Sequence, residues 1–213
     1  MKLAEIETTL RQNQLDVMGA LHPSGEEAPD GAGTIVLLGP LEPGFWPSFC
    51  ATPEYNDGHA DPLDRWSRRV IGMLADQLGA MPLFPFGGPP YWPFVRWALA
   101  SGRAHVSPVG LLVHDRAGLM VSYRGALAFT SKINVPPAPP SPCITCQDQS
   151  CRTACPVGAL TPDRYDLKAC KADLDRPGND CMAKGCAARR ACPVSRAHGR
   201  LEAQSAFHMS AFK

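Results

Sequence analysis

The sequence of 213 residues has no long apolar run, little net charge and no evident targeting segment. Its apolar stretches fall well short of the roughly 20 residues that cross a bilayer, so we expect no membrane association. The net charge of +1 leaves no overall basic excess, which argues against a nucleic-acid partner. Glu5 and Glu7 stand where a signal peptide carries bases, so we expect a cytoplasmic protein with reduced thiols.

Cysteine is scarce before residue 140, where Cys50 stands alone, and abundant afterwards. The later cysteines form two blocks that each end in Cys-Pro: Cys143-x2-Cys146-x4-Cys151-x3-Cys155-Pro156, and Cys170 followed by Cys181-x4-Cys186-x5-Cys192-Pro193. Two [4Fe-4S] clusters need four thiolates each, so the pattern predicts two clusters. Zinc also accepts four thiolates, but a zinc ribbon needs neither a closely following third cysteine nor a proline after the last. A disulfide framework does not suit the expected reducing compartment.

The distribution of charge agrees with bound clusters. Residues 141–213 contain 11 Lys and Arg against 7 Asp and Glu, whereas residues 1–140 contain 10 against 13. An oxidised cubane with four thiolates carries a charge of about −2, so two of them would balance the basic excess of the C-terminal part. The bases could also form a docking surface for an acidic redox partner.

A proline-rich segment divides the chain. Proline fixes φ and removes backbone donors, so residues 136–142 are expected to form a semi-rigid extended linker. We predict an α/β domain over residues 1–135 and a cluster-binding domain over residues 143–213.

Apolar periodicity predicts three helices and one strand in the first domain. Helices are expected over residues 2–14, 62–78 and 94–101, and the continuous apolar run at 34–38 is typical of a buried strand. For the second helix, Asp61 is expected to be the N-cap, and Pro62 suits the first helical position.

Two apolar segments predict a β-hairpin. Residues 109–114 and 119–128 flank the short turn 115–118, which contains a glycine. Antiparallel pairing beside helices indicates an α+β or mixed α/β fold. No G-x-G-x-x-G motif follows the first strand, which argues against a Rossmann fold.

The order of these features along the chain resembles the order found in epoxyqueuosine reductases. A helix, the segment Gly110-Leu111-Leu112-Val113-His114 with its hairpin, a proline-rich link and two Cys-Pro blocks follow one another. The chain is also similar, more distantly, to reductive dehalogenases and to cobalamin-processing proteins. The resemblance implies a nitroreductase-like α/β domain followed by a bacterial two-cluster ferredoxin-like module.

The resemblance also implies ligands and a further cofactor. One cluster would take Cys143, Cys146, Cys151 and Cys192, and the other Cys155, Cys170, Cys181 and Cys186. Family members hold a corrinoid in the N-terminal domain, and for such a cofactor, cobalamin, we predict contacts with Ser107, Gly110, Leu111 and His114.

The expected function is electron transfer by an oxidoreductase component. Single electrons would pass from a redox partner protein, through two [4Fe-4S] clusters, to a cofactor in the N-terminal domain. The stretch Phe86–Phe94 contains no acid where the family places a proton-donating aspartate, which argues against reduction of a tRNA epoxide. The alternative is a stand-alone ferredoxin-type carrier whose N-terminal domain docks a partner.

Overall fold

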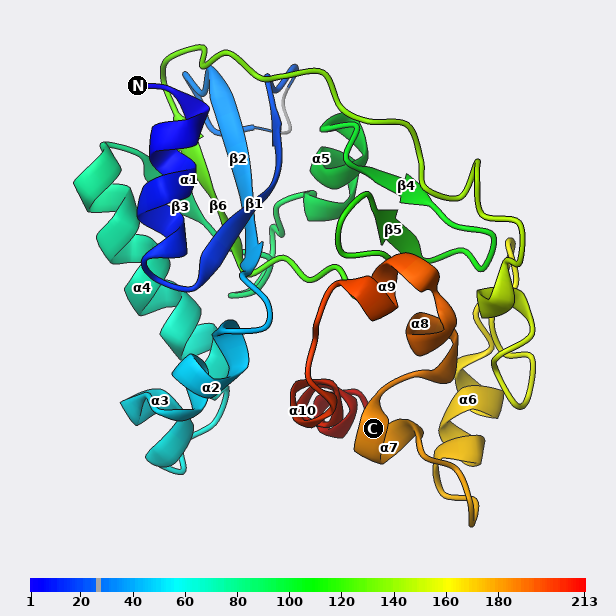
Figure 1. The fold of residues 1–213 in the computed structure, drawn as a ribbon. Coiled ribbons are helices and arrows are strands. Elements are labelled where there is room, and N and C mark those ends of the chain that lie inside the picture. The colour runs from blue at the N-terminus through cyan, green and yellow to red at the C-terminus, as the bar shows by residue number, and fades with distance from the viewer. Residues whose placement is uncertain (26–27) are drawn as a thin grey trace. The chain divides into compact units, whose positions relative to one another are not determined.

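A computed structural model describes residues 1–25 and 28–213 (Figure 1). The chain forms two compact units: unit 1 consists of Met1–Arg103 and Ser122–Ala138, and unit 2 of Ala104–Val121 and Pro139–Lys213. The sequence predicts a single domain over residues 1–135, whereas Ala104–Val121 belongs to the cysteine-containing unit. Helices and two small antiparallel sheets make up the fold.

Unit 1 contains an antiparallel sheet of four strands in the order β1-β2-β6-β3. The strands are β1 (Leu15–Leu21), β2 (Thr34–Pro40), β6 (Gly125–Phe129) and β3 (Met81–Leu83). Every residue of β1, β2 and β6 is buried, because helices cover the sheet and leave no solvent-facing alternation. The continuous apolar character of β2, expected from the sequence, is thereby confirmed.

The helices of unit 1 are α1 (Leu3–Arg11), α2 (Phe45–Cys50), α3 (Pro53–Asn56), α4 (Pro62–Leu78) and α5 (Phe94–Ala100). Helices α1 and α4 contact each other and the sheet, and α5 contacts β1 (Figure 1). The predicted helices α1, α4 and α5 are confirmed. Asp61 occupies the N-cap position of α4 as predicted, but it adopts a left-handed conformation and its side chain makes no cap hydrogen bond.

The predicted β-hairpin over residues 109–128 does not form, so this prediction is wrong. β5 (Leu112–His114) pairs with β4 (Ala104–Val106) in unit 2, and β6 pairs with β2 and β3 in unit 1. A tight turn remains, in which His114 and Gly118 exchange two backbone hydrogen bonds of 2.9 Å. The next residue, Leu119, bonds through its N–H to Ser195 Oγ and through its carbonyl to Arg189, so tertiary contacts occupy the groups that a hairpin would have used.

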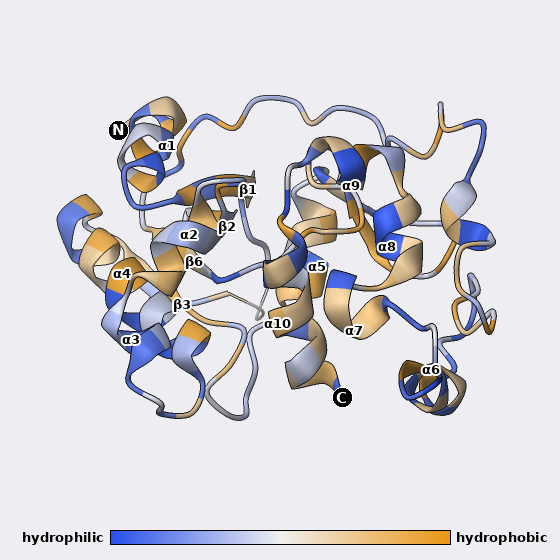
Figure 2. Ribbon diagram, turned by 60° about the horizontal axis from the view of Figure 1, so that its bottom comes forward, coloured by the Kyte–Doolittle hydropathy of each residue, from blue (hydrophilic) through white to orange (hydrophobic). Residues whose placement is uncertain are grey.

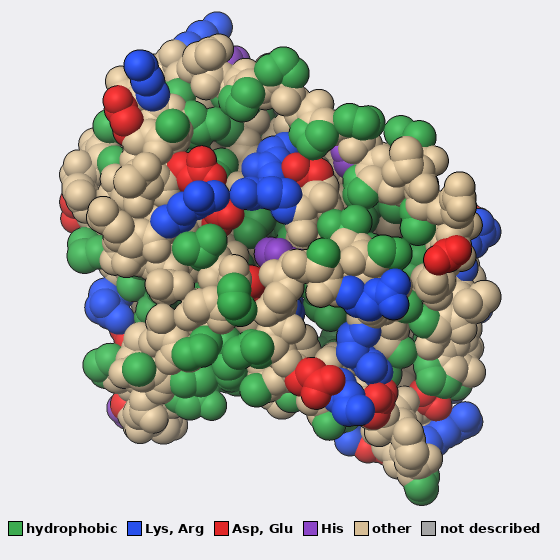
Figure 3. All heavy atoms as spheres, in the orientation of Figure 1, with side chains coloured by type: hydrophobic (Ala, Val, Ile, Leu, Met, Phe, Trp, Pro, Cys, Tyr) green, Lys and Arg blue, Asp and Glu red, His purple; other side chains and the backbone are tan. Residues whose placement is uncertain are grey.

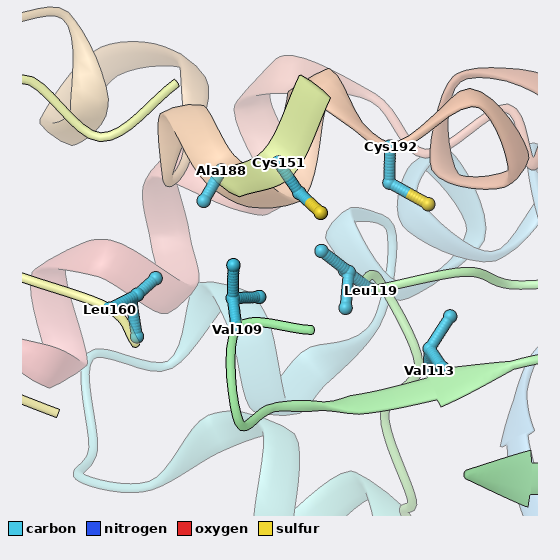
Figure 4. Packing of buried hydrophobic residues seen from close by; sticks show 7 residues of the cluster. All are labelled: Val109, Val113, Leu119, Cys151, Leu160, Ala188 and Cys192. Carbon is cyan, nitrogen blue, oxygen red and sulfur yellow. The ribbon is translucent and has the colours of Figure 1, made fainter. Parts of the chain in front are cut away.

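Unit 2 is built from short helices around a small apolar core. The helices are η1 (Ser150–Arg152), α6 (Leu167–Leu174), α7 (Cys181–Lys184), α8 (Ala187–Ala191), α9 (Pro193–Ala197) and α10 (Glu202–Phe212). The core consists of Val109, Val113, Leu119, Cys151, Leu160, Ala188 and Cys192 (Figure 4). Because three of these residues come from Ala104–Val121, that segment packs as part of unit 2.

Charged side chains gather on the surface of unit 2 over α7 and α8 (Figure 3). Helices α8 and α9 both contain hydrophilic stretches (Figure 2), and basic and acidic groups lie next to one another over α7 and α8 (Figure 3). Asp180 pairs with both Lys184 and Arg190 there. In the described part of the chain, none of the helices combines the length and the apolar character that crossing a membrane requires.

Candidate metal centres

The eight clustered cysteines all lie in unit 2, and Cys50 lies in unit 1. Cys143, Cys146 and Cys155 lie on loops, Cys151 in η1 and Cys170 in α6, whereas Cys181 begins α7, Cys186 precedes α8 and Cys192 precedes α9. All nine are free thiols. Five of the eight candidate ligands therefore lie within a short helix or directly before one.

The first cysteine set, Cys143, Cys146, Cys151 and Cys192, lines one cavity of about 400 Å³. Burial raises the pKa of Cys151, and the thiolates of the other three members raise it further. Burial likewise raises the pKa of Cys143, which the Ser141 hydroxyl lowers and the Cys192 and Cys146 thiolates raise. Four thiols thus face one volume closely enough to influence each other electrostatically.

The wall of this cavity is largely apolar on one side. Val113 and Leu119 line it together with Pro108 and Val194, and Leu119 is 1% exposed. Figure 4 shows Cys151 and Cys192 next to Leu119. Thiolates at this position are shielded from water and gain stability from a bound cation rather than from solvent.

The second cysteine set is Cys155, Cys170, Cys181 and Cys186. Burial raises the pKa of Cys170, the Tyr165 hydroxyl lowers it, and the thiolates of Cys186 and Cys155 raise it. Burial also raises the pKa of Cys181, where the backbone N–H of Ala187 acts in the opposite direction and the Cys186 thiolate adds to the rise. The pKa of Cys170 and the pKa of Cys181 are thus both raised by thiolates of the second set.

The second set receives hydrogen bonds from one loop. The N–H of Ala159 donates to Cys155 Sγ at 3.4 Å, and the hydroxyl of Tyr165 donates to Cys170 Sγ at 3.3 Å. Burial and the neighbouring Cys170 raise the pKa of Tyr165, so its hydroxyl retains the proton that it donates. Sequence spacing gave no signal for Tyr165, which lies outside both cysteine blocks.

The two cysteine sets offer thiolate sulfur as the donor, which suits zinc and iron-sulfur clusters. Within residues 1–25 and 28–213, no group of three His, Cys, Asp or Glu side chains converges closely enough to hold one metal ion. A tetrahedral zinc site with Zn–S bonds of about 2.3 Å brings its sulfurs to about 3.8 Å from one another. A cubane binds each thiolate at a different iron, so its four ligands surround a larger volume than the ligands of one metal ion, and the four thiols of the first set line one cavity.

The residues predicted to contact a corrinoid all belong to unit 2 and to the β4–β5 segment. Ser107 lines the cavity of the first cysteine set, and its Oγ accepts a hydrogen bond from Val109 N at 3.4 Å. Gly110 has φ +72° and approaches the Thr161 carbonyl so closely that a Cβ would lie 2.9 Å from it. Leu111 packs against the core. Of the four residues, the structure brings Ser107 to the candidate metal site.

His114 has a role in the turn that follows β5. The residue is fully buried, and its Nδ1 accepts hydrogen bonds from the N–H groups of Arg116 at 3.1 Å and Ala117 at 3.2 Å. These contacts hold the turn that leads to Leu119.

No family model, curated protein sequence or solved structure matches this chain. The interpretation of the site therefore depends on the chemistry and the grouping of its own residues.

Proposed function

We propose that the protein binds two [4Fe-4S] clusters and uses them to transfer single electrons. The first cysteine set would hold one cluster and the second set the other. The observation that carries this proposal is the placement of eight thiols in unit 2 with one set of four, Cys143, Cys146, Cys151 and Cys192, lining a single cavity.

The way in which the two cysteine sets draw members from both sequence blocks supports a two-cluster module in particular. Cys192 closes the second block of the sequence but belongs to the cavity of the first, and Cys155 closes the first block but influences Cys170 of the second. Such an exchange of the Cys-Pro cysteine is the arrangement of bacterial two-cluster ferredoxins. Zinc ribbons have no reason to exchange ligands in this way.

The basic residues of unit 2 support the same interpretation. Arg190 donates to the Gly185 carbonyl at 2.9 Å, and its charge lowers the pKa of Cys181, in which burial remains the larger influence. When bound, a cubane accepts and releases one electron and is anionic in both states. The chain contributes thiolate ligands, hydrogen bonds to sulfur, nearby positive charge and an apolar wall that limits access of water.

Iron and sulfide analysis tests the proposal. Anaerobically reconstituted protein is expected to contain about eight iron and eight sulfide per chain, because each cubane holds four of each. Cys50→Ser serves as the matched control and is expected to retain all of them, since Cys50 lies in unit 1. About one or two zinc ions per chain without sulfide would overturn the proposal.

Double variants test which cysteines share a cluster. Cys192→Ser is expected to reduce the iron content to about four per chain, and Cys143→Ser in addition is expected to remove little more, because both act on one cluster. Combining Cys192→Ser with Cys186→Ser is expected to remove nearly all iron. If Cys192→Ser with Cys143→Ser removed nearly all iron, and Cys192→Ser with Cys186→Ser left about four iron per chain, Cys192 and Cys186 would share a cluster.

For the acceptor of the electrons we propose a flat cofactor, for which cobalamin is the first candidate, so that the chain would be a reductase component. The size of unit 1 supports this, since all eight candidate ligands lie in unit 2 and the two clusters do not require unit 1 for ligands. In such a reductase component, we expect unit 1 to have a nitroreductase-like fold and unit 2 a ferredoxin-like fold. The alternative is a carrier that docks a partner through unit 1, and the contacts that hold Gly110 and His114 in their own turns favour it.

Cobalamin titration followed by tryptophan emission separates these two hypotheses. All four tryptophans lie in unit 1, and Trp92 stacks on Trp97 with ring centroids 5.8 Å apart. Quenching by cobalamin at tens of micromolar, with clusters intact, is the result expected of the reductase. Unchanged emission would favour the carrier.

A further inference from the structure

Tyr165 contacts a candidate cluster ligand through its hydroxyl. The hydroxyl donates to Cys170 Sγ at 3.3 Å, and the ring stacks on Phe212 of α10 with centroids 6.3 Å apart and an interplanar angle of 5°. The ring contact is structural, whereas the hydroxyl acts on sulfur. The two contributions can therefore be separated by substitution.

The backbone on both sides holds this contact in place. Residues 161–164 form a turn in which the N–H of Thr161 donates to the Arg164 carbonyl at 2.9 Å, and Leu160 pairs with Tyr165. Asp166 then caps α6 by accepting from Ala169 N at 2.9 Å. Because α6 carries Cys170, the turn and the cap fix the donor and the acceptor relative to each other.

A hydrogen bond to a cluster sulfur stabilises the reduced state more than the oxidised state, since the reduced cluster carries one more negative charge. The second cysteine set receives such bonds at Cys155 and Cys170. The first set receives a hydrogen bond from the Ser141 hydroxyl at Cys143 and packs against Val109, Val113 and Leu119, and an apolar wall disfavours additional charge. The apolar wall of the first set therefore acts on the reduction potential in the opposite direction to the hydrogen bonds of the second set.

We propose that Tyr165 is a positioning residue that sets the reduction potential of the cluster on the second cysteine set above that of the first, an inference that rests on the proposed function. The first cluster would be the stronger reductant of the pair, and the second the more readily reduced.

Redox titration of the full-length reconstituted protein, followed by electron paramagnetic resonance, tests this inference. Wild type is expected to show two potentials. Tyr165→Phe keeps the ring and is expected to lower the higher potential, with about a tenfold change in the reduction equilibrium, or about 59 mV for one electron. The lower potential is expected to stay unchanged.

Phe212→Leu is the matched control, because it removes the stacking partner and leaves the hydroxyl in place. Both potentials are expected to stay at their wild-type values in this variant. Unchanged potentials in Tyr165→Phe at full iron content, a fall in the lower potential, or a single potential for both wild-type clusters would each overturn the inference. Failure of the proposed function would appear differently, as an absence of iron and sulfide in the wild-type protein.

Discussion

Replacing Gly118 by alanine is expected to disrupt the packing of the turn before Leu119 on α9. Gly118 has φ +55°, and a Cβ there would lie 2.5 Å from Ser195 N and 2.6 Å from Ser195 Oγ. These atoms belong to the start of α9, directly after Cys192, and Ser195 Oγ accepts the 2.8 Å hydrogen bond from Leu119 N. The clash and the hydrogen bond therefore involve the same serine.

The magnitude follows from three contributions. A left-handed alanine costs about 1 to 2 kcal/mol, overpacking costs about 1 to 3 kcal/mol, and a buried N–H that loses its acceptor costs about 1 to 3 kcal/mol. Gly158 has φ +60° with nothing within 4 Å of a built Cβ, so Gly158→Ala carries the first cost alone. Gly118→Ala is thus expected to be about 2 to 6 kcal/mol more destabilising than this control.

Hydrogen exchange measured by mass spectrometry provides the assay. The peptide that contains the Leu119 amide should exchange faster in Gly118→Ala than in Gly158→Ala, by roughly 30-fold or more, since about 1.4 kcal/mol corresponds to tenfold. Equal exchange of this peptide in the two variants would refute the packing argument.

Two further predictions concern a helix cap and an ion pair. Asp166→Ala should destabilise α6 by about 1 kcal/mol through loss of the cap, with Asp166→Asn close to wild type, as measured by hydrogen exchange of the α6 peptide. In unit 1, a hydrogen bond from Arg69 lowers the pKa of Glu54, so this pair stabilises the fold above the ordinary carboxyl value of 4.5 and loses its effect as the pH falls through the lowered value. Urea unfolding followed by tryptophan emission should therefore show a steeper loss of stability on acidification in wild type than in Glu54→Gln, by up to about 1 kcal/mol; parallel pH profiles would contradict this.

Sequence patterns predicted elements whose signals are local. The apolar stripe of α4, with Pro62 at its start and Gly79 at its end, is sufficient to define that helix. Strand β1 carries no such signal, because its run includes Asp16, which is buried and pairs with Arg11. Its strand conformation comes from pairing with β2 rather than from its own residues.

The predictions that failed in unit 2 did so because contacts between residues far apart in the chain determine the structure there. Leu119 is held by Ser195 and Arg189, 76 and 70 positions later in the chain, so no local pattern could show that the hairpin would not form. The candidate ligands were evident because cysteine spacing is itself local. The hydrogen-bonding partner of Cys170 was not evident, because a tyrosine next to an aspartate cap has no distinctive spacing.

The discontinuous make-up of unit 2 bears on how the cysteine region can be manipulated. Val109, Val113 and Leu119 precede β6 of unit 1 in the chain, yet they form the apolar wall beside Cys151 and Cys192. A fragment that begins at the proline-rich segment would contain all eight thiols and lack that wall. The cysteine region therefore cannot be moved to another protein as a contiguous segment without losing that wall. During synthesis its cavity can be completed only after β6 of unit 1 and then Cys192 have been made.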